Sequence, residues 1–272
     1  MNMVCDLYNT LPGMQATFPG RGLSYGGLET VLGAGFYNMD CMDALKEYPD
    51  GYFDLAIVDP PYGDGNAGGG GITGLLRAAG LADISSAKAK KTENGPDVER
   101  RGGTWAEKYG RKIISWDTAP DEEYFRELFR VSKNQIIWGG NYFTLPPTRC
   151  FLIWRKLTIT ENFSMAMCEY AWTSFNDNAK LFECAPQGTT AERRFHPTQK
   201  PVKLYSWILS RYAKEGDRIL DTHVGSASSL IACHRAGLEY TGFEIDPEYY
   251  RSAAERLEAE KNQVNIFELL RN

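Results

Sequence analysis

A ten-residue stretch from Phe53 to Tyr62 combines a strand pattern with groups that can do chemistry. Its first part, Leu55 to Val58, is a short continuous apolar run, which is the pattern of a strand buried in a parallel sheet. Asp59 follows this run directly, and two prolines and an aromatic residue come next. Proline cannot extend a sheet ladder and restricts the backbone, so the turn is rigid. Ligands bind at the carboxyl ends of strands in open α/β sheets, which makes this turn a candidate site.

The side chains and carbonyl of this turn suit the activation of a planar exocyclic amine. The carboxylate of Asp59 and the carbonyl of Pro60 can each accept one hydrogen of such an amine. These two bonds draw the nitrogen lone pair out of conjugation and orient it for attack. Pro61 keeps the turn stiff, and Tyr62 offers a stacking face for the ring that carries the amine. No metal is required. A turn of this composition can also simply end a strand, so the rest of the chain has to decide.

Three more strand-like runs end in an acid. Residues 35–40 end in Asp40, residues 218–221 in Asp221, and residues 240–244 in Glu244. If these strands run parallel to the first, all four carboxylates lie along one edge of one sheet. One such acid is unremarkable, but four along one edge indicate a site for a polar ligand.

The segment from Asp221 to Glu244 has the pattern of a nucleotide-binding βαβ unit. A strand, a turn of small residues, a helix over residues 229–236 and a second strand ending in an acid follow one another. The terminal acid suits a ribose diol, but the full Gly-x-Gly-x-x-Gly pattern is missing. An acid before the glycine turn repels a pyrophosphate and suits a cation. A ligand with a ribose, an adenine and a positive end, such as S-adenosylmethionine, therefore fits better than NAD.

Length and composition favour a single α/β domain spanning residues 1–272, with a net charge of −5. The six cysteines show no paired metal-ligand spacing, and neither do the three histidines, so we expect reduced cysteines and no metal. No apolar run approaches the roughly 18 residues of a membrane span, and no signal peptide is evident. We therefore expect a cytoplasmic protein that does not associate with membranes.

Two segments look like insertions, and one helix start can be predicted. Residues 63–116 begin Gly-rich and are expected to form a long mobile loop beside the Pro-Pro turn. Between Arg77 and Lys112 this loop carries nine basic and five acidic residues, a local charge of +4 that suits either phosphate contacts or a solvated loop. Residues 145–195 are the candidate target-recognition insertion. Thr118 is the expected cap of the helix that follows the loop.

Four motifs carry a resemblance to a known family. They are Asp-Pro-Pro-Tyr at 59–62, His-Pro-Thr-Gln-Lys-Pro at 196–201, an Asp-x-x-x-Gly-Ser turn at 221–226 and Gly-Phe-Glu-Ile-Asp at 242–246. Together they resemble the amino-methylating DNA methyltransferases over roughly residues 36–260. The order, with the catalytic motif first, is similar to their β, circularly permuted group, and the variety resembles small adenine methyltransferases of phage and prophage. This implies a Rossmann-like methyltransferase fold, with a mostly parallel, doubly wound sheet and inserted target-recognition segments.

The resemblance also assigns roles. Asp59, Pro60, Pro61 and Tyr62 match the catalytic motif that grips the amine of a flipped-out base. The resemblance implies that Asp40 contacts the adenine of the cofactor, that Glu244 binds its ribose and that Asp221 lies near its methionine end. It also places Thr198, Gln199 and Lys200 beside the methionine carboxylate. The full implied cofactor set is Asp40, Cys41, Asp59, Thr198, Gln199, Lys200, Asp221, Gly225, Ser226, Glu244 and Ile245.

The chain departs from the family pattern in the cofactor turn. Ala227 stands where a second glycine is usual, and Thr222-His223 replaces the commoner Pro-Phe. Alanine is tolerable where a helix packs closely. His196 can be read equally as a helix-entry residue or as part of the site.

The sequence thus predicts an enzyme that transfers a methyl group from S-adenosylmethionine to N6 of a flipped-out adenine in double-stranded DNA, leaving S-adenosylhomocysteine. Cytosine-N4 methylation uses the same geometry and is the main alternative, since Asp at the first motif position leans to adenine and Ser to cytosine. RNA or protein-glutamine methylation would more often show Asn in place of Asp59. A non-catalytic DNA-binding partner of the same fold is a further alternative. A role in restriction-modification and a homodimer follow from the resemblance alone, and neither the recognition sequence nor a partner nuclease can be predicted.

Overall fold

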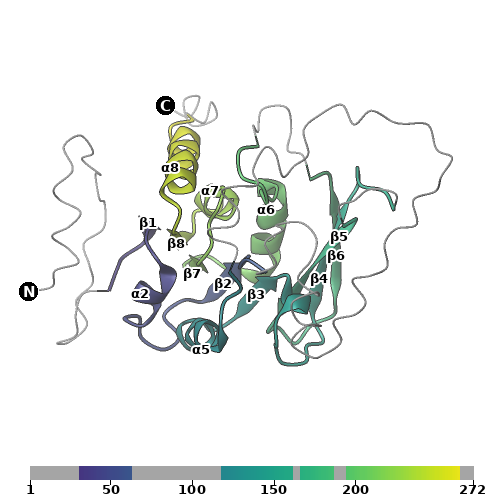
Figure 1. Cartoon of the computed structure of the whole chain (residues 1–272), viewed down its shortest axis with the longest axis horizontal. Coiled ribbons are helices and arrows are strands. Elements are labelled where there is room, and N and C mark those ends of the chain that lie inside the picture. The colour runs from purple at the N-terminus through teal and green to yellow at the C-terminus, as the bar shows by residue number, and fades with distance from the viewer. Residues whose placement is uncertain (1–30, 63–117, 162–165, 187–193, 264–272) are drawn as a thin grey trace, which may run out of the picture.

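The computed structural model describes residues 31–62, 118–161, 166–186 and 194–263, and these build one eight-stranded sheet with helices on both faces (Figure 1). The strands are β1 (Gly35–Asn38), β2 (Leu55–Val58), β3 (Gln135–Trp138), β4 (Phe151–Lys156), β5 (Cys168–Thr173), β6 (Lys180–Cys184), β7 (Arg218–Asp221) and β8 (Glu239–Glu244). The helices are α2 (Cys41–Leu45), α5 (Glu122–Val131), the 3-10 helix η3 (Gly140–Tyr142), α6 (Val202–Tyr212), α7 (Ser228–Arg235) and α8 (Pro247–Lys261).

The strand order is β1-β8-β7-β2-β3-β5-β4-β6. All pairs from β1 to β3 are parallel, and β2 shows the continuous apolar sequence expected of a strand inside such a sheet. Strand β5 is antiparallel to both of its neighbours, β3 and β4, whereas β4 and β6 are parallel. The prediction of a mostly parallel α/β sheet is therefore confirmed.

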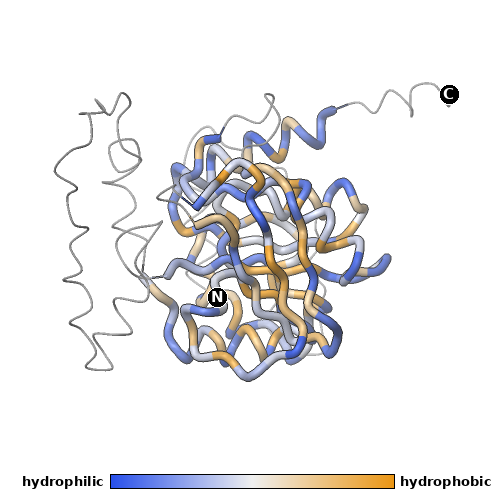
Figure 2. Tube along the Cα trace, turned by 90° about the vertical axis from the view of Figure 1, so that its right-hand side faces the viewer, coloured by the Kyte–Doolittle hydropathy of each residue, from blue (hydrophilic) through white to orange (hydrophobic). Residues whose placement is uncertain are grey.

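A separate hydrophobic core covers each face of the sheet. Helices α2 and α5 lie on one face, and α6, α7 and α8 lie on the other (Figure 1). Side chains alternate along a strand, so β2 sends Leu55 and Ile57 into the α6–α7–α8 core and sends Ala56 and Val58 into the α2–α5 core. Figure 2 shows the apolar residues concentrated along the inner strands. This double packing makes the sheet, including the end of β2, a rigid support for the site.

The four acids predicted to share one edge of the sheet do so. Strands β1, β8, β7 and β2 are consecutive and parallel, and Asp40, Glu244, Asp221 and Asp59 stand at or directly after their carboxyl ends. The helices that follow three of these strands begin at the same edge.

Helix starts follow local capping chemistry. The cap of α5 is Asp121, whose carboxylate accepts a hydrogen bond from the Tyr124 amide at 2.9 Å. The prediction of Thr118 as the cap was wrong, because the Asp three residues later satisfies the free amides of the first turn. Asp246 caps α8 in the same way, with Pro247 at the first helical position.

The two predicted insertions have different outcomes. The predicted loop 63–116 lies outside the described residues. Segment 145–195 contains β4, β5 and β6, which are integral strands of the sheet and not an appendage to it. Its role in target recognition stays a prediction. In the part of the chain that the structure describes, no helix is long and apolar enough to cross a membrane.

Candidate active site

The turn after β2 holds Asp59 and Tyr62 in mutual contact. Strand β2 is fully buried, and the hydroxyl of Tyr62 donates a hydrogen bond to Oδ1 of Asp59 at 3.2 Å. The Tyr62 ring stacks on Tyr142 of η3, with 4.4 Å between ring centroids and 23° between ring planes. Gly139 passes directly beneath the ring with a φ of 67°, and a Cβ added there would lie 2.1 Å from Cε1 of Tyr62. The position of Tyr62 thus depends on a glycine at 139.

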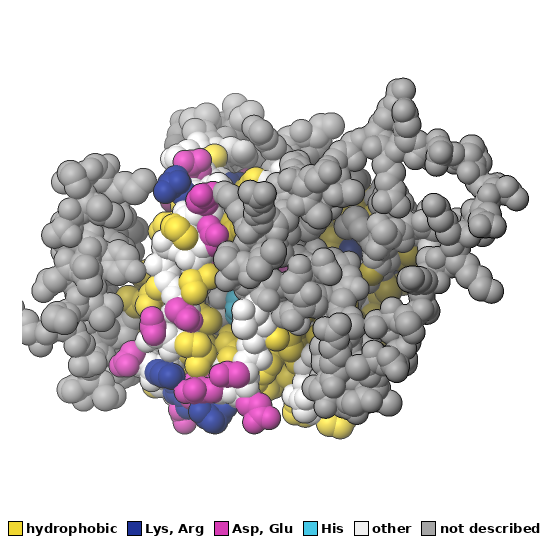
Figure 3. Space-filling model, in the orientation of Figure 1, with side chains coloured by type: hydrophobic (Ala, Val, Ile, Leu, Met, Phe, Trp, Pro, Cys, Tyr) yellow, Lys and Arg dark blue, Asp and Glu magenta, His cyan; other side chains and the backbone are white. Residues whose placement is uncertain are grey.

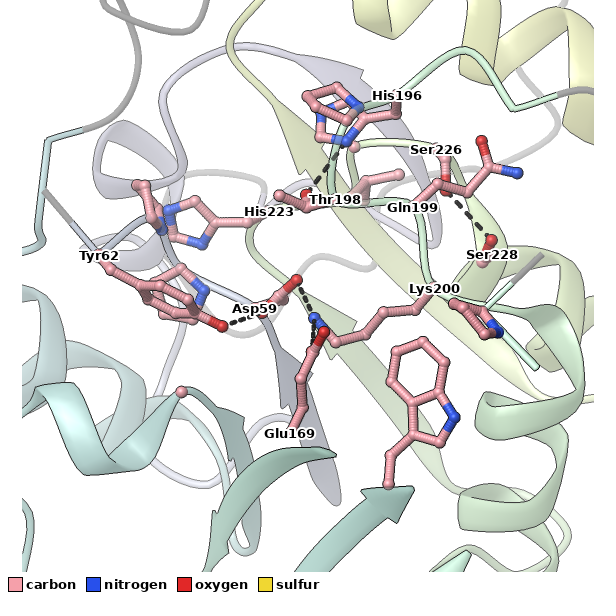
Figure 4. Close-up of a pocket in the computed structure, with 18 of the residues that line it drawn as sticks. Asp59, Tyr62, Glu169, His196, Thr198, Gln199, Lys200, His223, Ser226 and Ser228 are labelled. Atoms are coloured by element: carbon pink, nitrogen blue, oxygen red, sulfur yellow. Dashed lines mark hydrogen bonds and ion pairs between the residues drawn. The ribbon is translucent and has the colours of Figure 1, made fainter. Parts of the chain in front are cut away.

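Three charged side chains lie on the side of Asp59 opposite to the Tyr62 hydroxyl. The ammonium of Lys200 forms an ion pair with Oδ2 of Asp59 and a second one with Oε2 of Glu169 at 3.1 Å. Glu169 on β5 also pairs with Lys156 on β4, at 2.6 Å. Figure 4 shows Asp59 between Tyr62 and Lys200, with Glu169 beyond the ammonium. Lys200, which the resemblance placed beside the cofactor carboxylate, therefore contacts the carboxylate of Asp59 in this structure.

Burial and mutual pairing set the charges of this group. Burial raises the pKa of Asp59, and Lys200 opposes that shift. Burial by itself raises the pKa of Glu169, but Lys200 and Lys156 hold it down at about 2. Burial lowers the pKa of Lys200, and Asp59 and Glu169 more than reverse this. The formal charges of Asp59, Glu169, Lys156 and Lys200 sum to zero.

The turn between β7 and α7 is fixed to the end of β8 through Glu244. Its Oε2 accepts a hydrogen bond from the Gly225 amide at 2.8 Å, and its Oε1 accepts one from the Asp246 amide at 2.9 Å. Gly225 has a φ of 56°, and Ala227 adopts the left-handed region with a φ of 61°. Ala227 is also completely buried, so the position where the family usually has glycine keeps a glycine-like backbone despite its side chain.

Asp221 lies buried beneath this turn. Its Oδ1 accepts a hydrogen bond from the His223 amide at 3.0 Å, and its Oδ2 accepts one from the Ser229 hydroxyl. Burial raises the pKa of Asp221 to about 7 in spite of these bonds. The carboxyl group therefore titrates near neutral pH.

His196 packs against the same turn and belongs to the site. A Cβ on Gly225 would lie 3.2 Å from its ring, which also lies edge-on to Tyr249. Its Nδ1 is hydrogen-bonded to the hydroxyl of Thr198 at 3.2 Å. Burial, with Arg194 and Lys200, lowers the pKa of His196 to about 3, so the ring is neutral. His196 thus lies at the cavity wall, and its function there stays a prediction.

One cavity of about 410 Å³ joins the two ends of this arrangement. The predicted site residues that line it are Asp59, Pro60, Pro61, Tyr62, Thr198, Gln199, Lys200, Gly225, Ser226, Glu244 and Ile245. The structure does not bring three others to its wall: Asp40 caps α2, Cys41 is buried in the α2–α5 core and Asp221 lies beneath the turn. Their part in cofactor binding stays a prediction.

Comparison with known proteins gives the family. A family model described as DNA methylase, covering N6 and N4 methylases, matches residues 137–255. The protein YubD of Escherichia coli strain K12, described as "Putative methylase YubD", is 33% identical over 238 residues, which span 82% of this chain and 90% of that protein. This chain belongs to the N6/N4 DNA methylase family. It is also similar to the Type II methyltransferase M2.DpnII of Streptococcus pneumoniae, at 28% identity over 83% of this chain and 90% of that protein.

Comparison with solved structures finds the PvuII DNA methyltransferase, described as cytosine-N4-specific. The two sequences are 13% identical, and the match spans 86% of this chain and 93% of the PvuII chain with a TM-score of 0.49.

The cavity lining includes residues that the sequence reasoning missed, among them two charged strand residues, Glu169 and Lys156. Each is a charged residue in a strand whose other side chains are mainly apolar, and that was the available signal. Trp154 pairs with Glu169 across the two antiparallel strands, so Lys156 lies diagonally opposite on the same face. This register could not be read from either strand alone.

The described outer surface of the methylase is mixed in charge. In Figure 3, Asp and Glu side chains gather near α8 and along the edge that carries α5, with Lys and Arg among them. Lys46 and Glu123, on opposite sides of the contact between α2 and α5, form one such surface ion pair at 3.0 Å. Surface pairs of this kind contribute little to stability.

Proposed function

We propose that this DNA methylase transfers a methyl group from S-adenosylmethionine to N6 of an adenine in double-stranded DNA in the cytoplasm. The observation that carries the proposal is that the amine-binding turn at Asp59 and the cofactor turn at Gly225 and Glu244 open into one cavity. Because the Asp59 motif precedes the Asp221 turn in the chain, we assign the enzyme to the β, circularly permuted group.

The residues at the Glu244 end of the cavity fit S-adenosylmethionine. Each Glu244 oxygen accepts a hydrogen bond from a backbone amide, and a carboxylate oxygen has a further lone pair that can accept from a ribose hydroxyl. The cavity volume of about 410 Å³ falls in the range of small-molecule sites. The carboxylate of Glu244 favours a ligand that carries positive charge at that end of the cavity. When bound, the cofactor supplies an electrophilic methyl group.

The residues of the β2 turn then prepare the target amine. Asp59 and the Pro60 carbonyl accept the two amine hydrogens, which orients the nitrogen lone pair toward the cofactor end of the cavity. The negative charge of Asp59 stabilises the positive charge that grows on the nitrogen. Tyr62, fixed by Gly139 and Tyr142, supplies stacking for a base that has left the duplex. No covalent bond between a cysteine and the base is needed.

Adenine is favoured by Asp at the first position of the motif. The amine of cytosine could be held by the same two acceptors, so the base has to be identified directly.

Nucleoside mass spectrometry tests this proposal. The purified protein is incubated with double-stranded plasmid from a methylation-deficient host and with S-adenosylmethionine that carries a trideuterated methyl group. We expect labelled N6-methyladenine after digestion to nucleosides. Labelled N4-methylcytosine would retain the mechanism but contradict the assigned base. Absence of any labelled nucleoside would contradict the proposed function.

A further inference from the structure

The Glu169 carboxylate has no place in the chemistry described so far, although it lines the cavity. It belongs to β5, outside the four motifs that carry the family resemblance. Its side chain is about a quarter exposed, and its two oxygens are bound to different ammonium groups. A carboxylate in such a position needs a reason, because burying charges is costly unless each is paired.

The pairing is arranged so that Glu169 reaches Asp59 through one intermediary. Lys200 is only 3% exposed and contacts the carboxylates of Asp59 and Glu169 at the same time. Its ammonium also lies 5.2 Å from the centre of the Trp138 ring. The ammonium is thus fixed on the side of Asp59 away from the Tyr62 hydroxyl, as Figure 4 shows.

The charges around Lys200 determine how well Asp59 can stabilise positive charge on the amine. If Lys200 paired with Asp59 alone, the pair would be neutral and would stabilise a growing positive charge on the amine less well. Glu169 shares the same ammonium, so Asp59, Lys200 and Glu169 together carry one negative charge. Lys156 then compensates that charge from the far side of Glu169.

We propose that Glu169 is a positioning residue for methyl transfer, which holds the Lys200 ammonium and prevents it from neutralising Asp59. This rests on the proposed function. Glu169 acts through Lys200 and does not itself contact the base or the cofactor. Its loss leaves Lys156 and Lys200, two cations, against the single carboxylate of Asp59.

The ion pair between Lys156 and Glu169 offers a matched comparison. Both Glu169→Gln and Lys156→Met break this pair, and both remove the same link between β4 and β5. Their electrostatic effects on Asp59 are opposite, because the first leaves the group with a net charge of +1 and the second with −1. A purely structural role for the pair would make the two variants equally impaired.

The experiment measures kcat and KM for wild type, Glu169→Gln, Glu169→Asp and Lys156→Met with labelled S-adenosylmethionine and plasmid DNA. Glu183→Gln, which breaks the exposed Arg155–Glu183 pair, is the surface control. We expect Glu169→Gln to lower kcat about 30-fold, with less than about a 3-fold change in KM for DNA. Glu169→Asp should recover part of the loss, and Lys156→Met should lose several-fold less activity than Glu169→Gln. Thermal unfolding of each variant confirms that the comparison is between folded proteins.

Equal losses in Glu169→Gln and Lys156→Met, or a Glu169→Gln variant within about 3-fold of wild type, would overturn the inference. If Glu169→Gln fails to fold, the ratio between Glu169→Asp and Lys156→Met decides: the inference requires the lysine variant to be at least as active. These outcomes are separate from failure of the proposed function, which would appear as inactive wild-type protein.

Discussion

At the scale of single residues, Asp221 shows how burial couples the cofactor turn to pH. Its carboxyl group is 3% exposed, and burial raises its pKa to about 7, against roughly 4 in an unfolded chain. Between these two values the folded protein binds more protons at this residue than the unfolded chain. Its contribution to stability is therefore fully present below about pH 4 and is lost as pH rises to about 7.

Asp221→Asn should consequently stabilise the cofactor-free protein at high pH. The amide resembles the protonated acid and can still accept from the His223 amide while donating to Ser229. We expect a gain of roughly 2–4 kcal/mol in the free energy of unfolding at pH 8 and little change at pH 4. Urea unfolding of both proteins at the two pH values measures this. A difference between the proteins that is the same at both pH values would refute the assigned titration.

Substitution of Glu244 is expected to affect cofactor binding, because its two oxygens accept hydrogen bonds from backbone amides of the turn. Glu244→Ala should weaken S-adenosylmethionine binding about 30-fold and leave DNA binding within about 3-fold, since charged hydrogen bonds are lost only at the cofactor end. Titration calorimetry gives the first value and a DNA-binding titration the second. Glu255→Ala on the exposed face of α8 is the control. The reverse pattern would contradict the assignment of this end of the cavity.

At the scale of elements, the turn from β3 into η3 sets the position of Tyr62. Gly139→Ala places a Cβ 2.1 Å from the Tyr62 ring on a backbone with a φ of 67°. We expect a loss of about 100-fold in kcat, because displacement of a group that positions substrate by about 1 Å has that effect. Affinity for S-adenosylmethionine should be retained.

Gly216→Ala is the matched control for this variant. Gly216 has a φ of 85°, so alanine is strained there too, but nothing lies within 4 Å of the added Cβ. Its activity should equal that of wild type per folded molecule in the same methyl-transfer assay. Similar activity losses in the two variants would show that backbone strain, and not Tyr62, is responsible.

The elements that could be predicted are those with a local pattern. Short strand-like runs ending in an acid identified β1, β2, β7 and β8, and the continuous apolar run of β2 reflects burial on both faces of the sheet. The cap of α5 was missed by three residues, since Thr118 and Asp121 are both capping residue types. The ion pairs of Glu169 depend on the register of β4 against β5 and on Lys200, about 30 residues further along the chain. No local pattern contains that information.

The sequence also does not predict in which direction a side chain points at the end of a strand. Asp40, Asp59 and Asp221 all follow or end strands at one edge of the sheet. Only Asp59 of these three lines the cavity, because Asp40 turns back to cap α2 and Asp221 is covered by the turn that follows it. The edge could be predicted, but not which carboxylates face the ligand.

At the scale of the whole molecule, two parts of one sheet meet at the cavity. The parallel part, β1 to β3, supplies the acids and the cofactor turn, and the antiparallel extension from β5 supplies Glu169 and Lys156. Asp59 stands after β2 and is contacted by Lys200 from the segment before α6. We therefore infer that both parts of the sheet act on Asp59.

The most direct test of the proposed role of Asp59 compares plasmid DNA from cells that express wild-type protein with plasmid DNA from cells that express Asp59→Ala. Methylated bases are quantified by mass spectrometry after digestion to nucleosides, and S-adenosylmethionine binding of both purified proteins is measured alongside. We expect N6-methyladenine with wild type, at least a 1000-fold lower methylation rate (about 4 kcal/mol) in the variant, and cofactor binding by both. Equal methylation by a folded Asp59→Ala protein would contradict the proposed role.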